Sequence, residues 1–403
     1  MMIRIVRSRG YLCPLAWTLS LLLDAQPAQA QLPPEMQLPP GAEVLTPFQR
    51  AQRDRERAKP FLDLLAVYRS GQIDRAIADV RPFLAPQNVD VHGDPPELLL
   101  EWLHRTEQLI LEARKKKDES KDAELTRQLE TFLLLSTEVL LHDWPTTSLK
   151  TQKLNATWTY LDFVYDTLMR LGDKSQLLRA WYLLWDSFRQ AHITYTWEGW
   201  PQYSKQALEM FPDDAEILLS AGARSELQWW TGFNERRDLG KIKNPLAPVA
   251  DLVLEDAREL LRRSLRLNPK ESETRLRLAH VLLELDERDE AMKLLSGHPW
   301  PSDEAAFEYL ACLFEGDLQA KRGDVAAALK LYDRAIALVP VSQSARLAKA
   351  QLLYAQGRRP DAVALSTEVL TDDKPQLDPW WLFITGRAWR MPAYLKLARS
   401  MVM

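Results

Sequence analysis

Histidine side chains are the residues of this sequence that most readily bind a metal ion or move a proton at neutral pH. No two of them stand at the i, i+4 spacing that presents both from one helix, and no H-E-x-x-H motif occurs. A lone helix histidine is more simply a surface or packing residue, so we predict no metal site. The six histidines are His92, His104, His142, His192, His280 and His298.

The cysteine, glycine and acidic residues also form no pattern that indicates a catalytic or cofactor site. Cys312 follows Ala311 on a predicted repeat helix, where a small buried residue is favoured over a reactive thiol. Neither G-x-S-x-G nor the G-x-x-x-x-G-K-[ST] phosphate loop is found. The acidic pair Glu255-Asp256 indicates a solvated face, because neighbours on a helix point about 100° apart. We therefore predict no enzyme and no cofactor; the alternative is a catalytic site assembled from residues distant in sequence.

The elements that carry these residues are predicted to be helices. Of 403 residues, 46% are hydrophobic and 27% charged, which suits a folded chain. Helix-forming Leu, Ala, Glu, Arg and Lys dominate, Gly is scarce, and long alternating Val/Ile/Thr runs are missing. The net charge of −4 offers no basic field, so nucleic acid is not expected as a partner. The predicted fold class is all-α.

Residues 1–30 have the pattern of a secretory signal peptide. Arg4, Arg7 and Arg9 precede an apolar stretch over 11–23, and an A-x-A cleavage site stands at 28–30. The stretch is shorter than the roughly 20 residues that span a bilayer, so cleavage is favoured over an uncleaved anchor. We expect an exported protein, periplasmic or in the cell envelope, with no stable membrane span after cleavage and no intramolecular disulfide, since one cysteine remains.

Two regions follow the signal peptide. Residues 31–47 are Pro-rich and contain QLPP twice, which predicts an extended linker. Residues 48–199 form an N-terminal helical region, in which a hairpin over 61–84 precedes longer helices over 96–117, 122–142, 150–171 and 175–193. This region could contain degenerate copies of the repeats that follow it.

A period near 34 residues marks residues 200–403. Ala257, Ala291, Ala328 and Ala362 are 34, 37 and 34 residues apart, and each begins the second helix of a predicted hairpin. Small residues are needed there because the two helix axes lie closest at that point. An insertion at about 231–250 interrupts one hairpin, and a capping helix is expected at the C-terminus.

The most complete unit, residues 309–342, resembles a tetratricopeptide repeat. The small, aromatic and closing-proline positions of that family are taken by Gly316, Gly323, Ala328, Tyr332, Ala335 and Pro340. The resemblance covers roughly residues 200–391. It implies a right-handed superhelical stack of antiparallel hairpins, in which the first helix of each hairpin lines a concave groove that receives a peptide.

The resemblance also assigns groove positions and a function. We expect an exported scaffold for protein–protein interaction, whose partner is another protein or peptide. The pattern by which some family members clamp a C-terminal carboxylate is missing. The expected groove residues are Glu216, Leu219, Glu226, Glu273, Leu276, His280, Leu313, Asp317, Leu347, Gln351 and Tyr354.

Tryptophan is the one residue in excess, with 14 in the chain. Core packing is the simpler interpretation, because Trp181 and Trp185 share one helix face. The alternative is an aromatic groove, and it carries an alternative function: a periplasmic carrier or a glycan- or hydrophobic-ligand-binding protein. The central cluster is Trp181, Trp185, Trp197, Trp200, Trp229 and Trp230.

Overall fold

The computed structural model describes residues 47–84, 97–143, 175–191, 200–238, 247–301, 305–371, 378–384 and 386–403. All regular elements in these ranges are helices, as the composition predicts. The chain divides within its first helix into two units, residues 1–56 and 57–403. The signal peptide, most of the Pro-rich linker and the helix predicted over 150–171 lie outside the described residues. In the ranges above, no helix is both long and apolar enough to cross a membrane.

Six helices precede the hairpins described below. In chain order they are α1 (Pro47–Arg69), α2 (Ile73–Leu84), α3 (Glu97–Lys115), α4 (Glu119–Asp143), α6 (Gln176–Ala191) and α7 (Trp200–Met210). Their apolar faces share one core, in which Phe61 stacks on Trp102 with ring centroids 5.2 Å apart and Trp102 meets Phe132 edge-on.

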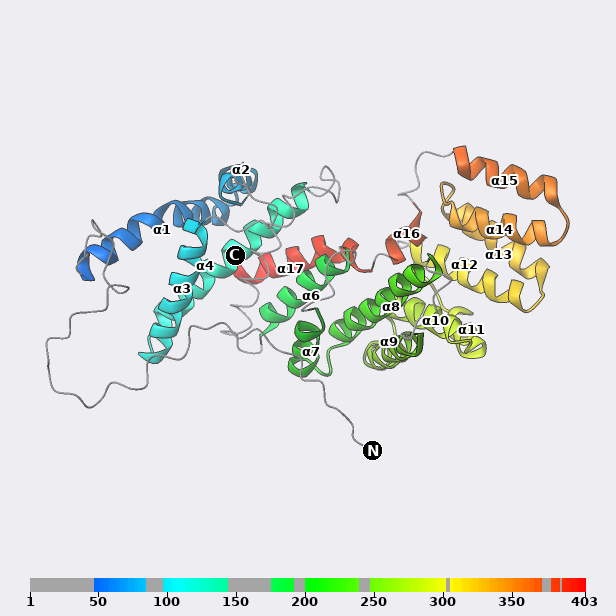
Figure 1. Cartoon of the computed structure of the whole chain (residues 1–403), viewed down its shortest axis with the longest axis horizontal. Coiled ribbons are helices and arrows are strands. Elements are labelled where there is room, and N and C mark those ends of the chain that lie inside the picture. Colours follow the sequence, from blue (N-terminus) through cyan, green and yellow to red (C-terminus); the bar gives the residue numbers. More distant parts are fainter. Residues whose placement is uncertain are drawn as a thin grey trace, which may run out of the picture. The chain divides into compact units, whose positions relative to one another are not determined.

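Four antiparallel hairpins follow, each pairing one helix with the next (Figure 1). Of the insertion predicted at about 231–250, residues 231–238 belong to the first helix of the first hairpin, and residues 247–250 belong to its second helix. The hairpins are α8 (Ala215–Asp238) with α9 (Ala247–Leu267), α10 (Ser272–Glu284) with α11 (Arg288–Leu295), α12 (Ala305–Lys321) with α13 (Val325–Leu338), and α14 (Ser344–Ala355) with α15 (Arg359–Thr371).

The repeated small residues explain why these helices pair. Ala257, Ala291 and Ala328 are fully buried, so the two helices of each hairpin approach to the distance that a methyl group allows. Gly323, in the turn between α12 and α13, has φ +85°, a conformation that side chains other than glycine rarely adopt. Asp324 then caps α13, because its carboxylate accepts a hydrogen bond from the backbone amide of Ala327.

The C-terminal segment, residues 378–403, does not continue the series of hairpins. It consists of α16 (Pro379–Ile384), a 3-10 turn η3 (Ala388–Arg390) and α17 (Met391–Val402). The closing helix α17 packs against α6 and α4, far back in the sequence (Figure 1). Met391, Tyr394, Leu395 and Ala398 enter the core of the N-terminal helices. The predicted capping helix therefore packs on the region that precedes the repeats.

Candidate functional site

A cavity of about 360 Å³ opens between the first helices of successive hairpins. Its lining combines apolar side chains with carboxylates, a lysine and an amide, so it could bind an amphipathic segment. The lining residues are Trp230 of α8; His280, Leu283 and Glu284 of α10; Leu313, Phe314, Asp317, Leu318 and Lys321 of α12; Ser344, Leu347, Ala348 and Gln351 of α14; and Trp380 of α16. We call it the open groove.

Asp317 is the most deeply set carboxylate of the open groove. It accepts a hydrogen bond of 2.6 Å from the hydroxyl of Tyr332, on the second helix of the same hairpin. Burial raises the pKa of Asp317, and the opposing effects of Tyr332, Lys321 and His280 do not cancel that rise. The carboxylate is held in place by a hairpin partner.

Aromatic rings form one wall of the open groove. Trp380 of the C-terminal segment lies edge-on to Trp230 and to His280, with ring centroids 5.8 and 5.6 Å away. Phe314 completes the group at 5.9 Å from Trp380. The C-terminal segment thus provides part of the surface that a ligand would meet.

Next to the open groove, the first helices carry a buried ion-pair network. Arg277 of α10 donates to Glu226 of α8 at 2.8 Å and to Glu273, one turn earlier, at 3.0 Å. Glu226 also lies 2.6 Å from Nδ1 of His280. Buried charges are tolerated only when opposite charges and hydrogen bonds compensate them, and these groups supply both.

The network continues into the C-terminal segment through Arg387, whose side chain is 0% exposed. Its guanidinium donates to both oxygens of Glu273 at 3.0 Å and to Glu216 of α8 at 2.8 Å. Burial alone would raise the pKa of Glu273, but the charges of Arg387, Arg277 and Arg390 outweigh it and lower that pKa from 4.5 to about 2. Glu273 is therefore a carboxylate at any physiological pH.

Side chains of α10 and α6 also bind the backbone of this segment. Arg277 donates to the carbonyl of Gly386 at 3.1 Å and to that of Phe383 at 3.3 Å. Gln190 of α6 accepts a hydrogen bond of 2.9 Å from the amide of Arg387. Gly386 has φ +81°, and a Cβ there would lie 2.5 Å from Oε1 of Gln190, so only glycine fits. We call Gln190, Glu216, Glu273 and Arg277 the seat.

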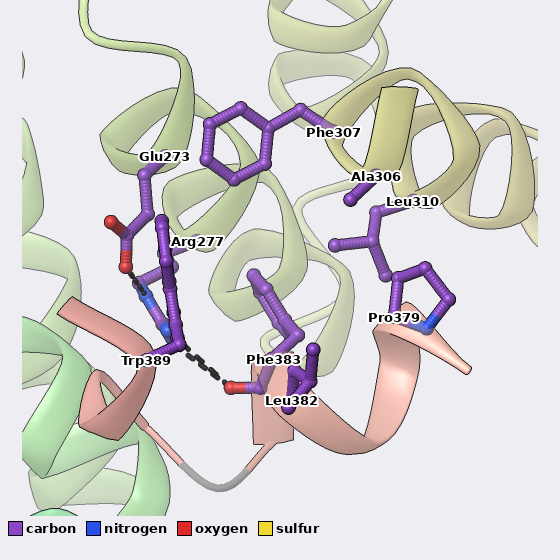
Figure 2. Close-up of a pocket in the computed structure, with 9 residues that line it drawn as sticks. All are labelled: Glu273, Arg277, Ala306, Phe307, Leu310, Pro379, Leu382, Phe383 and Trp389. Atoms are coloured by element: carbon purple, nitrogen blue, oxygen red, sulfur yellow. Dashed lines mark hydrogen bonds and ion pairs between the residues drawn. The ribbon is translucent and has the colours of Figure 1, made fainter. Parts of the chain in front are cut away.

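A second, smaller cavity of about 160 Å³ lies between α10, α12 and the C-terminal segment. Figure 2 shows Phe307 and Leu310 of α12 facing Phe383 and Trp389 of the segment, with α10 on a third side. Trp389 is 36% exposed and lies edge-on to Phe307. The lining is almost wholly apolar and consists of Glu273, Arg277, Ala306, Phe307, Leu310, Pro379, Leu382, Phe383 and Trp389.

Comparison with known proteins agrees with the hairpin geometry. Two family models described as tetratricopeptide repeat match residues 254–299 and 315–376. These parts of the chain are tetratricopeptide repeats. The matched residues span α9 to α11 and α12 to α15, which carry most of the lining of the open groove.

Solved structures similar to this repeat protein share little sequence with it. A crystal structure of MamA is 20% identical with a TM-score of 0.30, covering 42% of this chain and 84% of that chain. The crystal structure of yeast Tom70 is 13% identical with a TM-score of 0.33, covering 87% of this chain and 80% of that chain. The crystal structure of the APC/C hetero-tetramer Cut9-Hcn1 is 15% identical with a TM-score of 0.28, covering 87% of this chain and 74% of that chain. Among curated proteins, none matches this chain in sequence.

The structure places the eleven expected groove positions in four different environments. Five line the open groove: His280, Leu313, Asp317, Leu347 and Gln351. Glu216, Glu226 and Glu273 belong to the ion-pair network, where arginines of this same chain neutralise them. Leu219 and Leu276 are buried core residues, and Tyr354 is exposed beside Arg359 at the C-terminal end of α14.

The expected tryptophan cluster also divides. Trp181, Trp185 and Trp229 are buried, whereas Trp230 lines the open groove. Trp197 lies outside the described residues, and the side chain of Trp200 is not among those described.

Sequence reasoning missed the site residues that come from the C-terminal segment. Trp380 contacts Trp230 of α8, and Arg387 contacts Glu273 of α10. Each pair is more than 100 residues apart in the sequence, so no local spacing of residues predicts these contacts. One signal was present: Glu216, Glu226 and Glu273 all fall on expected groove positions, and such an acidic stripe requires basic partners. Arg387 and Arg390 follow Gly386 in a unit that departs from the repeat pattern.

Proposed function

We propose that this tetratricopeptide-repeat protein is an exported scaffold whose open groove binds a segment of another protein in the periplasm or cell envelope. The observation that carries the proposal is the open groove itself, lined from the first helices of three successive hairpins, α10, α12 and α14. Repeat proteins use such extended concave surfaces for recognition. Export rests on the signal-peptide pattern of residues 1–30.

The lining favours an amphipathic ligand with at least one cationic group. Leu313, Phe314 and Leu347 offer apolar contacts, while the carboxylates of Glu284 and Asp317 face a single ammonium, that of Lys321. Apolar anchors supply most of the binding energy of such a segment, and complementary charges set its orientation.

We assign the chain a binding role and no catalytic one. Two carboxylates with shifted pKa values, one in the groove and one in the neighbouring network, have structural partners: Asp317 accepts from Tyr332, and Glu273 is paired with Arg387. Within the described ranges, no three His, Cys, Asp or Glu side chains are grouped to hold a metal ion.

Site-directed photo-crosslinking in the native cell tests the proposal. A benzophenone amino acid at Gln351, on the rim of the open groove, is expected to crosslink one defined protein. The same group at Leu370, which is 85% exposed on α15 away from the groove lining, is the control. Leu347→Arg should abolish the crosslink without unfolding the chain, since Leu347 is 46% exposed. Identical products from both positions would contradict a groove partner.

Export has its own test. The protein should be recovered from the periplasmic or envelope fraction with Gln31 as its first residue. An intact N-terminus in the cytoplasmic fraction would refute the export part of the proposal and leave the groove part standing.

A further inference from the structure

We propose that Gly386 and Arg387 of the C-terminal segment are an exchangeable intramolecular ligand of the seat, and that the partner displaces them with an arginine-containing segment of its own while α17 stays packed in the N-terminal core. This inference deepens the proposed function and rests on it. It adds a second binding subsite, the seat, beside the open groove. The groups of Gly386 and Arg387 that occupy the seat show which chemical groups it binds. The partner segment would carry a glycine followed by arginine, with an apolar residue a few positions before the glycine.

The seat holds the segment as a groove holds a peptide. Three helices contribute, with Gln190 from α6, Glu216 from α8, and Glu273 and Arg277 from α10. Both the backbone and one side chain are bound: an amide and two carbonyls, together with the guanidinium of Arg387. Contacts to the backbone of a segment so remote in sequence are contacts that another chain could make equally well.

The charges of the seat determine which side chain can replace Arg387. Glu273 is 1% exposed and Glu216 is 27% exposed. If the segment left and nothing replaced it, Glu273 would keep Arg277, but Glu273 and Glu216 would both lose the guanidinium of Arg387. Removing one partner from a buried ion-pair network is strongly unfavourable. Arginine also fits better than lysine, because its planar fork donates to both carboxylates at once. An empty seat is therefore a poor final state, and exchange needs a second arginine.

The segment does not fill the seat perfectly, which leaves room for a competitor. The open apolar cavity of about 160 Å³ lies between the segment, α10 and α12, and has space for a larger apolar side chain (Figure 2). Nη1 of Arg387 is buried without a hydrogen-bond partner among the described residues. A partner segment with a larger apolar residue near Phe383, or with one more acceptor near the guanidinium, would gain both contacts.

Peptide binding to the full-length protein tests the exchange. The probe is a fluorescein-labelled synthetic peptide with the sequence of residues 378–403, followed by fluorescence anisotropy. The tethered segment competes at a high effective concentration, so wild type should bind the peptide weakly. In Gly386→Val the new side chain overlaps Gln190 and weakens the tethered segment, while the seat is unchanged. We expect at least tenfold tighter binding to this variant than to wild type.

Two controls separate exchange from general loosening of the protein. Gly357→Val places valine at a similar φ of +77° in the turn after α14, with nothing within 4 Å of the new Cβ, and should bind like wild type. A peptide with Arg387→Ala should not bind Gly386→Val. If Gly386→Val does not fold, full-length Arg387→Ala is titrated with the same two peptides, and the same tighter binding is expected.

The outcomes are distinguishable from those of the crosslinking test. Equal peptide affinity in wild type and Gly386→Val, or undiminished binding of the Arg387→Ala peptide, would overturn the exchange. Neither result depends on the partner, so the open groove could still bind a protein. Conversely, exchange could be observed while no partner crosslinks at Gln351, which would count against the proposed function alone.

Discussion

Gly316 and Tyr332 lie in contact across the hairpin of α12 and α13. A Cβ on Gly316 would be 2.6 Å from Cε1 of the Tyr332 ring, closer than carbon atoms pack. The ring is fixed at its far end as well, because its hydroxyl donates to Asp317 in the open groove. The glycine of the repeat therefore lets the aromatic residue hold a groove carboxylate in position.

Gly316→Ala should destabilise the protein by about 1–3 kcal/mol, the usual cost of overpacking a core. Tyr332→Leu should cost less stability in the Gly316→Ala background than in wild type, because the smaller side chain makes room for the methyl group. Urea unfolding of the two single variants and the double variant measures the coupling. Strictly additive losses would show that the two residues do not compete for space.

The repeats could be predicted from sequence because their signals are local. Ala328 and Gly323 hold their positions within one hairpin, and the same spacing returns in the next as Ala362 and Gly357. The packing that these residues allow depends on neighbours within about 30 positions. The periodic pattern was therefore enough to predict the repeat helices and their pairing into hairpins.

The seat could not be predicted in this way. Glu273 and Arg387 are 114 residues apart, and Gln190 binds the Arg387 amide across 197 residues. Family positions correctly placed Glu216 and Glu273 on the first helices. They could not show that the chain's own C-terminal segment meets these carboxylates, because that depends on where α17 packs.

Asp378 should be among the most sensitive positions of the C-terminal segment. It is fully buried, accepts from the amides of Gln343 and Ser344 at the start of α14, and from Trp380 at the start of α16. Asp378→Ala should cost about 2–3 kcal/mol, because charge-assisted hydrogen bonds are lost from buried amides. The control is Asp324→Ala, an exposed cap that should cost about 1 kcal/mol. Equal losses in urea unfolding would contradict the double-capping role.

The lowered pKa of Glu273 predicts that the folded protein loses stability in acid. Its folded pKa of about 2 lies below its ordinary value of 4.5, so its contribution is fully present above pH 4.5 and is lost as the pH falls toward 2. The difference in unfolding free energy between wild type and Glu273→Gln should be largest near pH 6, at roughly 3 kcal/mol, and should shrink by pH 3. Urea midpoints at both pH values measure it. A difference that does not change with pH would argue that the Arg387 pair contributes nothing to the acid response.

The raised pKa of Glu130, on α4, predicts the opposite dependence, a loss of stability as the pH rises. Burial raises the pKa of its carboxyl to about 7, and the charge of Arg127 only partly offsets this. The folded state therefore favours the protonated form, so the stability that wild type has below pH 4.5 declines as the pH rises through 7. Glu130→Gln keeps the size and removes the charge, and should raise the thermal midpoint at pH 8 while changing it little at pH 4. Glu112→Gln, on the exposed face of α3, should shift neither midpoint. If Glu130→Gln failed to stabilise the protein at pH 8, the carboxylate of Glu130 would have to be compensated by a group other than Arg127.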